Sequence, residues 1–120
     1  MAAADEAFLY LGADFEANLS FINGAEIKRL NSVYRGQKKP TDVLSFKLDD
    51  ESGGDIVICQ EIADKEASEW GLEFSAMYQL LTIHGILHLA GLDHEKVKDR
   101  AKMEDAEALI MEKLGVTLER

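Results

Sequence analysis

Apolar and polar residues alternate in some stretches of the chain and follow a helical spacing in others. Alternation over residues 15–22 predicts a half-buried strand. Residues 41–48 predict another strand, and the continuous apolar run at 55–59 predicts one that is covered on both faces. A short edge strand is expected at residues 8–11. These segments together predict a small sheet of three to four strands.

Four helices are predicted from apolar residues that recur at helical spacing. They cover residues 24–34, 60–70, 73–90 and 96–114. Asn23 is the expected N-cap of the first, while Gly71 and Gly115 end the second and the last. Because 73–90 is apolar nearly all round, it is expected to be the central buried helix. The order of elements predicts an α+β fold, with a small mixed sheet packed with helices in a single domain over residues 1–120.

The composition is that of an ordinary soluble globular protein. Apolar residues make up 47% of the 120 residues and charged residues 30%. No apolar run approaches membrane-spanning length, and the first ten residues lack the basic start of a signal peptide. The single cysteine, Cys59, cannot form an internal disulfide. A cytoplasmic protein without membrane contact is therefore expected.

The net charge of −10 argues at first against nucleic-acid binding, but the charge is unevenly distributed. Residues 24–47 hold six basic and two acidic residues, a local charge of +4 that leaves −14 for the remainder. Such a basic patch on an acidic body favours selective binding of a phosphate chain. The alternative is a helix end and loop whose charges are simply solvated. The basic residues are Lys28, Arg29, Arg35, Lys38, Lys39 and Lys47.

All three histidines of the chain lie in one segment, HGILHLAGLDH at residues 84–94. His84 and His88 are four residues apart and so share one face of a helix. Gly91 can end that helix in a left-handed conformation and return the chain, which brings His94 toward the other two. Three imidazole ligands with an open fourth position are typical of a catalytic zinc site. The alternative is that the three histidines have no common role.

The spacing matches the zinc-protease pattern H-E-x-x-H-x-x-G-x-x-H except at one position. Gly85 stands where those proteases carry the glutamate that acts as general base, which argues against a peptidase. Gly85 allows close approach of a substrate or backbone, or else tight helix packing. A purely structural zinc site would need a fourth protein ligand, and Cys59 is the one thiol in the chain.

Four segments together resemble the YbeY family of bacterial metal-dependent endoribonucleases. They are LNSVYRG at 30–36, PTDVLSF at 40–46, GDIVI at 54–58 and the histidine segment, together with the spacing of Met103 and Glu107. The resemblance runs from about Phe15 to Gly115. The chain departs from the family in its short region before Phe15, in Lys47 where many members have proline, and in its short acidic loop at 49–54.

The resemblance implies a hydrolase of single-stranded RNA that acts in ribosomal RNA maturation and ribosome quality control. It implies one zinc ion per chain on His84, His88 and His94, and nickel or another divalent transition metal would also suit such ligands. A ribosomal RNA precursor is then the expected substrate, and proteins of the small ribosomal subunit are expected partners. A zinc-containing module that binds RNA or the ribosome without catalysis is the alternative.

Three further roles are expected around the metal. Arg35 is the candidate for stabilising negative charge on the phosphoryl oxygens, as the resemblance also implies. Lys38 and Lys39 are candidates for binding flanking phosphates. Asp93 is a candidate base, or a residue that orients His94. The alternatives are a surface loop for the three basic residues and a helix-capping turn for Asp93.

Overall fold

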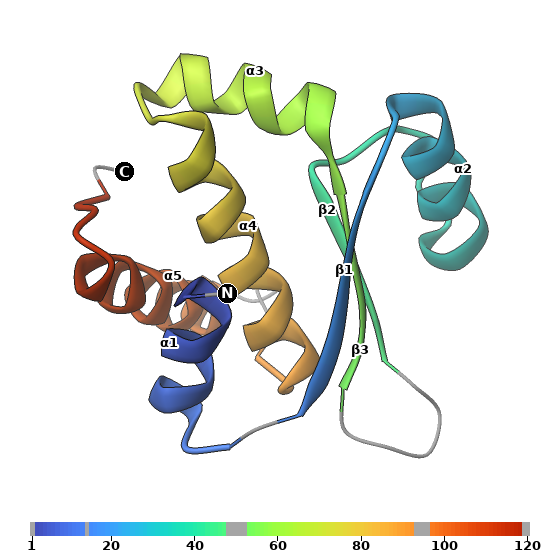
Figure 1. The fold of residues 1–120 in the computed structure, drawn as a ribbon. Coiled ribbons are helices and arrows are strands. Elements are labelled where there is room, and N and C mark those ends of the chain that lie inside the picture. The colour runs from blue at the N-terminus through green and yellow to red at the C-terminus, as the bar shows by residue number, and fades with distance from the viewer. Residues whose placement is uncertain (1, 14, 48–52, 93–96, 119–120) are drawn as a thin grey trace.

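One mixed sheet of three strands lies between helices in the computed structural model, which describes residues 2–13, 15–47, 53–92 and 97–118 (Figure 1). The strands are β1 (Glu16–Ile22), β2 (Val43–Lys47) and β3 (Gly53–Cys59), in the order β1-β3-β2. Strand β1 runs parallel to β3, whereas β2 is antiparallel to it. The predicted α+β fold with a small mixed sheet is confirmed.

Helices cover both faces of this sheet. Helix α4 (Phe74–Leu89) lies on one face together with α1 (Ala2–Leu11) and α5 (Val97–Lys113), and α2 (Gly24–Arg35) lies on the other (Figure 1). Helix α3 (Gln60–Trp70) continues directly from β3 and leads into α4. The four predicted helices are confirmed within a few residues at each end.

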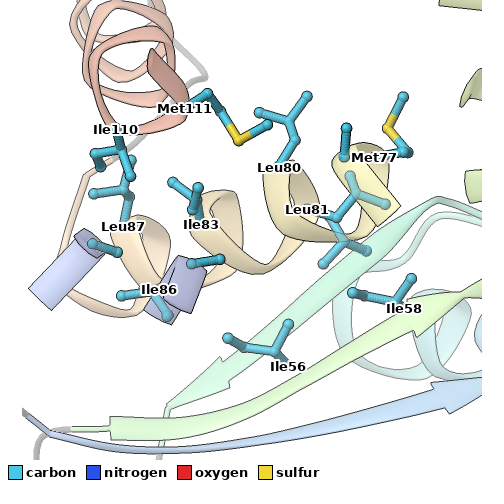
Figure 2. Close-up of a cluster of buried hydrophobic side chains, with 14 of the residues drawn as sticks. Ile56, Ile58, Met77, Leu80, Leu81, Ile83, Ile86, Leu87, Ile110 and Met111 are labelled. Carbon is cyan, nitrogen blue, oxygen red and sulfur yellow. The ribbon is translucent and has the colours of Figure 1, made fainter. Parts of the chain in front are cut away.

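Helix α4 is the centre of the main core. Ten of its sixteen residues are buried, because it packs on the sheet with one side and on α1 and α5 with others. Figure 2 shows Ile56 and Ile58 of β3 directed at this helix from the sheet, and Ile110 and Met111 approaching it from α5. Although α4 is strongly apolar, no helix in the described part of the chain is both long and apolar enough to cross a membrane.

Helix α2 begins and ends as the sequence predicted. The Asn23 side chain accepts a hydrogen bond from the backbone N–H of Glu26 at 2.9 Å, which caps the helix start. Gly36 ends the helix with a φ of 68°. The buried side chain of Ile27 packs with Leu44 and Cys59, so a second, smaller core lies between α2 and the sheet.

The prediction of an edge strand at residues 8–11 is wrong, because these residues belong to helix α1. Ala3 and Ala7 are fully buried one helical turn apart, and Phe8 and Leu11 continue the same apolar side against the core. The four-residue window was too short to distinguish alternation from a helical period. The alanines before it, which favour a helix, carried the missing signal.

The start of β3 depends on two glycines. A Cβ at Gly53 would lie 2.1 Å from the carbonyl oxygen of Glu16, and one at Gly54 would lie 1.9 Å from that of Phe46. Both neighbouring strands therefore approach the β3 backbone more closely than any side chain permits. Strand β3 therefore begins at Gly53, two residues before the predicted start at residue 55.

Candidate metal centre

Helix α4 carries His84 and His88 on one face, one turn apart. Their rings are nearly parallel, at 5°, with centroids 6.5 Å apart. After His88 the helix ends as expected, because Gly91 has a φ of 103° and its N–H donates to the His88 carbonyl at 3.0 Å. The predicted ligands His84 and His88 thus sit together beside a turn that redirects the chain.

His94 and Asp93 lie outside the described residues. Within the described part of the chain, no group of three or more histidine, cysteine or acidic residues is arranged to hold a metal ion. The histidine pair is therefore the part of the predicted ligand set that the structure describes, and the convergence of His94 on it stays a prediction.

A buried carboxylate orients His84. Glu107 Oε2 lies 2.6 Å from His84 Nδ1, and the Glu107 side chain is only 3% exposed. A carboxylate can only accept a hydrogen bond, so Nδ1 carries the proton, and in the neutral ring Nε2 is then the nitrogen with the lone pair. Histidines that bind metals are commonly held by such a carboxylate.

Glu107 was not among the candidate site residues, although the sequence contained a signal for it. On α5 it follows Met103 by one helical turn and precedes Ile110, both of which are buried in the core. A carboxylate within the apolar stripe of a helix must have a polar partner, because an unpaired buried charge is very costly. That partner, His84, lies on a different helix.

A cavity of about 190 Å³ opens beside His84. Helices α4 and α5 supply apolar lining from Leu80, Leu81 and Met103, while Arg100 supplies a positive charge. A cavity of this volume has room for several water molecules. The further lining residues are Asp42, Trp70, Glu104 and Glu107.

Asp42 brings a third acidic group to this cavity, beside Glu104 and Glu107. Its Oδ1 accepts hydrogen bonds from the Val43 N–H at 2.8 Å and from the Thr41 hydroxyl at 3.2 Å. Glu66 of α3 faces Asp42, and burial together with the charge of Asp42 raises the pKa of Glu66 to about 8. A carboxyl group that holds its proton at neutral pH therefore lies next to the cavity wall.

The predicted phosphate-binding residues lie elsewhere. Arg35 ends α2, on the opposite side of the sheet from α4, and Lys38 and Lys39 follow in the exposed loop (Figure 1). The buried Asn31 holds this loop to α2, because its side-chain amide donates to the Lys39 carbonyl at 2.9 Å. Arg100 is the basic residue among the described residues that line the cavity. Arg35, Lys38 and Lys39, which the sequence predicted for phosphate binding, do not line it beside His84.

Gly85 makes close packing between α4 and the sheet possible. A Cβ at this position would lie 2.8–3.0 Å from three side-chain carbons of Ile56, and Gly85 itself is buried. Of the two interpretations, tight packing is the one that the contacts support. The thiol of Cys59 packs with Ile27 and Leu44 against α2, so it faces away from α4 and does not complete a structural zinc site with His84.

Comparisons with known proteins show which family the chain resembles. The family model described as Endoribonuclease YbeY matches residues 2–115. A curated protein of that name from Colwellia psychrerythraea is 39% identical over 110 residues, which span 87% of this chain and 71% of the relative. One from Ruthia magnifica is 41% identical over 107 residues, spanning 84% of this chain and 74% of the relative.

A solved structure shares the fold. The solution structure of a target protein from Thermotoga maritima superimposes with a TM-score of 0.60 at 32% sequence identity. The similarity covers 95% of this chain and 79% of the other. The match with the family model includes α1, so the resemblance extends further toward the N-terminus than the predicted start near Phe15.

Proposed function

Because the chain belongs to the YbeY endoribonuclease family and is therefore a hydrolase acting on RNA, we propose that it cleaves single-stranded RNA with a metal ion held by His84, His88 and His94. The observation that carries the proposal is the Glu107–His84 contact of 2.6 Å beside a histidine one turn away. A buried carboxylate that fixes one imidazole tautomer is more typical of a histidine that binds a metal than of a histidine packed in a core.

The donor set fits a divalent transition metal. His84 offers Nε2 because Glu107 engages Nδ1, and His88 presents its ring parallel to that of His84. When bound, such an ion would supply Lewis acidity toward a phosphoryl oxygen and a lowered pKa for water. Zinc is the proposed ion, one per chain, and nickel would also suit imidazole ligands.

Residues of the chain itself bind and orient the RNA in this proposal. Arg100 lines the cavity together with His84 and three carboxylates, and its guanidinium is the group there that can contact a phosphodiester oxygen. Arg35 at the end of α2 and Lys38 and Lys39 in the exposed loop after it bind phosphates further along the strand. Asp93 orients His94 or accepts a proton, as its position next to that ligand suggests.

The expected setting is ribosomal RNA maturation and ribosome quality control in the cytoplasm. The substrate is then a single-stranded segment of a ribosomal RNA precursor, with proteins of the small subunit as partners. The small cavity supports action on a flexible strand, because a single-stranded segment can bend a phosphodiester into it whereas a duplex is stiff.

Cleavage and metal content test the proposal together. We expect untagged wild-type protein to contain one metal ion per chain by elemental analysis, and to cleave a labelled single-stranded RNA. His88→Ala should lose both properties, while Tyr10→Ala on the exposed side of α1 should keep them. Full cleavage by metal-free His88→Ala, in matched preparations, would reject the histidine site.

A further inference from the structure

A groove lies on the sheet face opposite to α4, beside the part that α2 covers. The strand register places Asn18, Asp55 and Phe46 in one row across β1, β3 and β2. The next row of the sheet contributes Ser20 and Val57. With Leu30 and Tyr34 of α2 as its wall, the groove encloses about 440 Å³, a volume typical of small-ligand sites.

Two aromatic rings form the apolar part of this groove. Tyr34 and Phe46 meet edge to face, with centroids 5.1 Å apart at 61°. Although it belongs to this pair, the Tyr34 side chain remains 66% exposed. An exposed aromatic ring held in place by a neighbour offers a surface on which a flat ring can stack.

The floor of the groove carries a positioned carboxylate. Asp55 is exposed, and the Asn18 side-chain amide donates to its Oδ1 at 3.2 Å. Because Asp55 sits in the central strand, the backbone that carries it is held on both sides. An ionised carboxylate only accepts hydrogen bonds, so its ligand must present donors.

Basic residues near the groove favour a negatively charged polymer as the ligand that presents these hydrogen-bond donors to Asp55. A separate hollow of about 410 Å³ is lined by Lys28 of α2 and by Lys38 of the loop after it, and Arg35 directly follows Tyr34. This is the stretch whose net charge is +4 in a chain of −10. Phosphates can therefore bind along α2 while a base enters the groove.

We propose that this groove is a base-binding subsite that takes one unpaired guanine of the RNA strand. The guanine ring stacks on Tyr34, and its adjacent N1–H and N2–H groups donate to the Asp55 carboxylate. Adenine and cytosine present a ring nitrogen acceptor beside their amino group, and uracil presents two carbonyls, so each would place an acceptor against the carboxylate. The subsite rests on the proposed action on RNA.

Binding is measured apart from cleavage. Fluorescence anisotropy is recorded with the non-cleaving His88→Ala protein and labelled oligouridines that carry a single central guanine, inosine or adenine. We expect guanine to bind roughly ten-fold more tightly than adenine, with inosine between them because it lacks the amino group. Tyr34→Ala should weaken guanine binding roughly ten-fold, whereas Tyr34→Phe should preserve it.

The variants separate the two contacts. Asp55→Asn should remove the preference for guanine over adenine without removing binding, and Tyr10→Ala should change neither property. Equal affinity of the unsubstituted groove for guanine and adenine would overturn the subsite, as would unchanged binding in Tyr34→Ala. Concentration-dependent dimerisation that Tyr34→Ala abolishes would instead assign the groove to a second copy of the chain.

Cleavage by the protein with His88 intact distinguishes the two proposals. If the subsite exists, Tyr34→Ala should raise KM for a guanine-containing RNA and leave kcat within about two-fold, because the groove is remote from the histidines. A protein that binds guanine selectively but cleaves nothing would reject the nuclease site alone. Cleavage without guanine selectivity would reject the subsite alone.

Discussion

Adding a methyl group at Gly85 tests how α4 is seated on the sheet. In an exposed helix, glycine to alanine stabilises by about 1 kcal/mol. Here the new Cβ would lie 2.8 Å from Ile56 Cγ2, 2.9 Å from Cδ1 and 3.0 Å from Cγ1. Overpacking of this kind costs about 1–3 kcal/mol, so Gly85→Ala should be neutral or destabilising by up to about 2 kcal/mol.

A double-mutant cycle isolates the contact. Ile56→Ala removes all three carbons that the Cβ would meet, at a cost of about 2–5 kcal/mol for the cavity. In that background the helix propensity is no longer opposed, so Gly85→Ala should stabilise by about 1 kcal/mol. The expected coupling energy is therefore about 1–3 kcal/mol.

Urea denaturation followed by circular dichroism measures each free energy of unfolding. Ile56→Val, which removes one of the three contacting carbons, gives an intermediate coupling if the alanine variant is too unstable to measure. If Gly85→Ala stabilises the wild-type protein by the full 1 kcal/mol, the packing explanation is refuted. An additive cycle would refute it as well.

Three further outcomes follow from single contacts. Burial and Asp42 raise the pKa of Glu66 to about 8, so the contribution of this group to stability falls as pH rises from about 4.5 toward 8. Glu66→Gln should therefore stabilise the protein by about 1–2 kcal/mol at pH 8, after allowance for solvent screening, and should not do so at pH 4. Equal pH profiles of thermal melting in the two proteins would contradict this. Asn23→Ala should cost about 1 kcal/mol, or about 4 °C in Tm, by loss of the cap, whereas Asn23→Ser should restore most of it in the same melting assay. Glu107→Ala should lower metal affinity about 10–100-fold in a chelator competition. Glu107→Gln should lower it less, because the amide oxygen still accepts a hydrogen bond from His84. Equal affinities in the wild type and both variants would show that the carboxylate does not orient a ligand.

Several contacts of the candidate site could not be predicted from the sequence. The pairing of Glu107 with His84 joins residues 23 apart on two helices. Asp42 and Arg100 share one cavity because α4 packs both against the sheet and against α5. Local patterns describe a residue's neighbours within about one helical turn or two strand positions. Distances between elements are set by packing, so they appear only in the folded chain.

What the sequence determined by itself was local. Helical spacing located four helices, Asn23 capped α2, and the interval of four residues placed His84 and His88 on one face of α4. The tertiary structure decided which faces meet. It packs α1 rather than an edge strand against the core, and it brings Gly85 into close contact with Ile56. It also places α2, which ends at Arg35, across the sheet from α4. Periodicity fixes the side of an element that is buried, whereas only side-chain packing selects its partner.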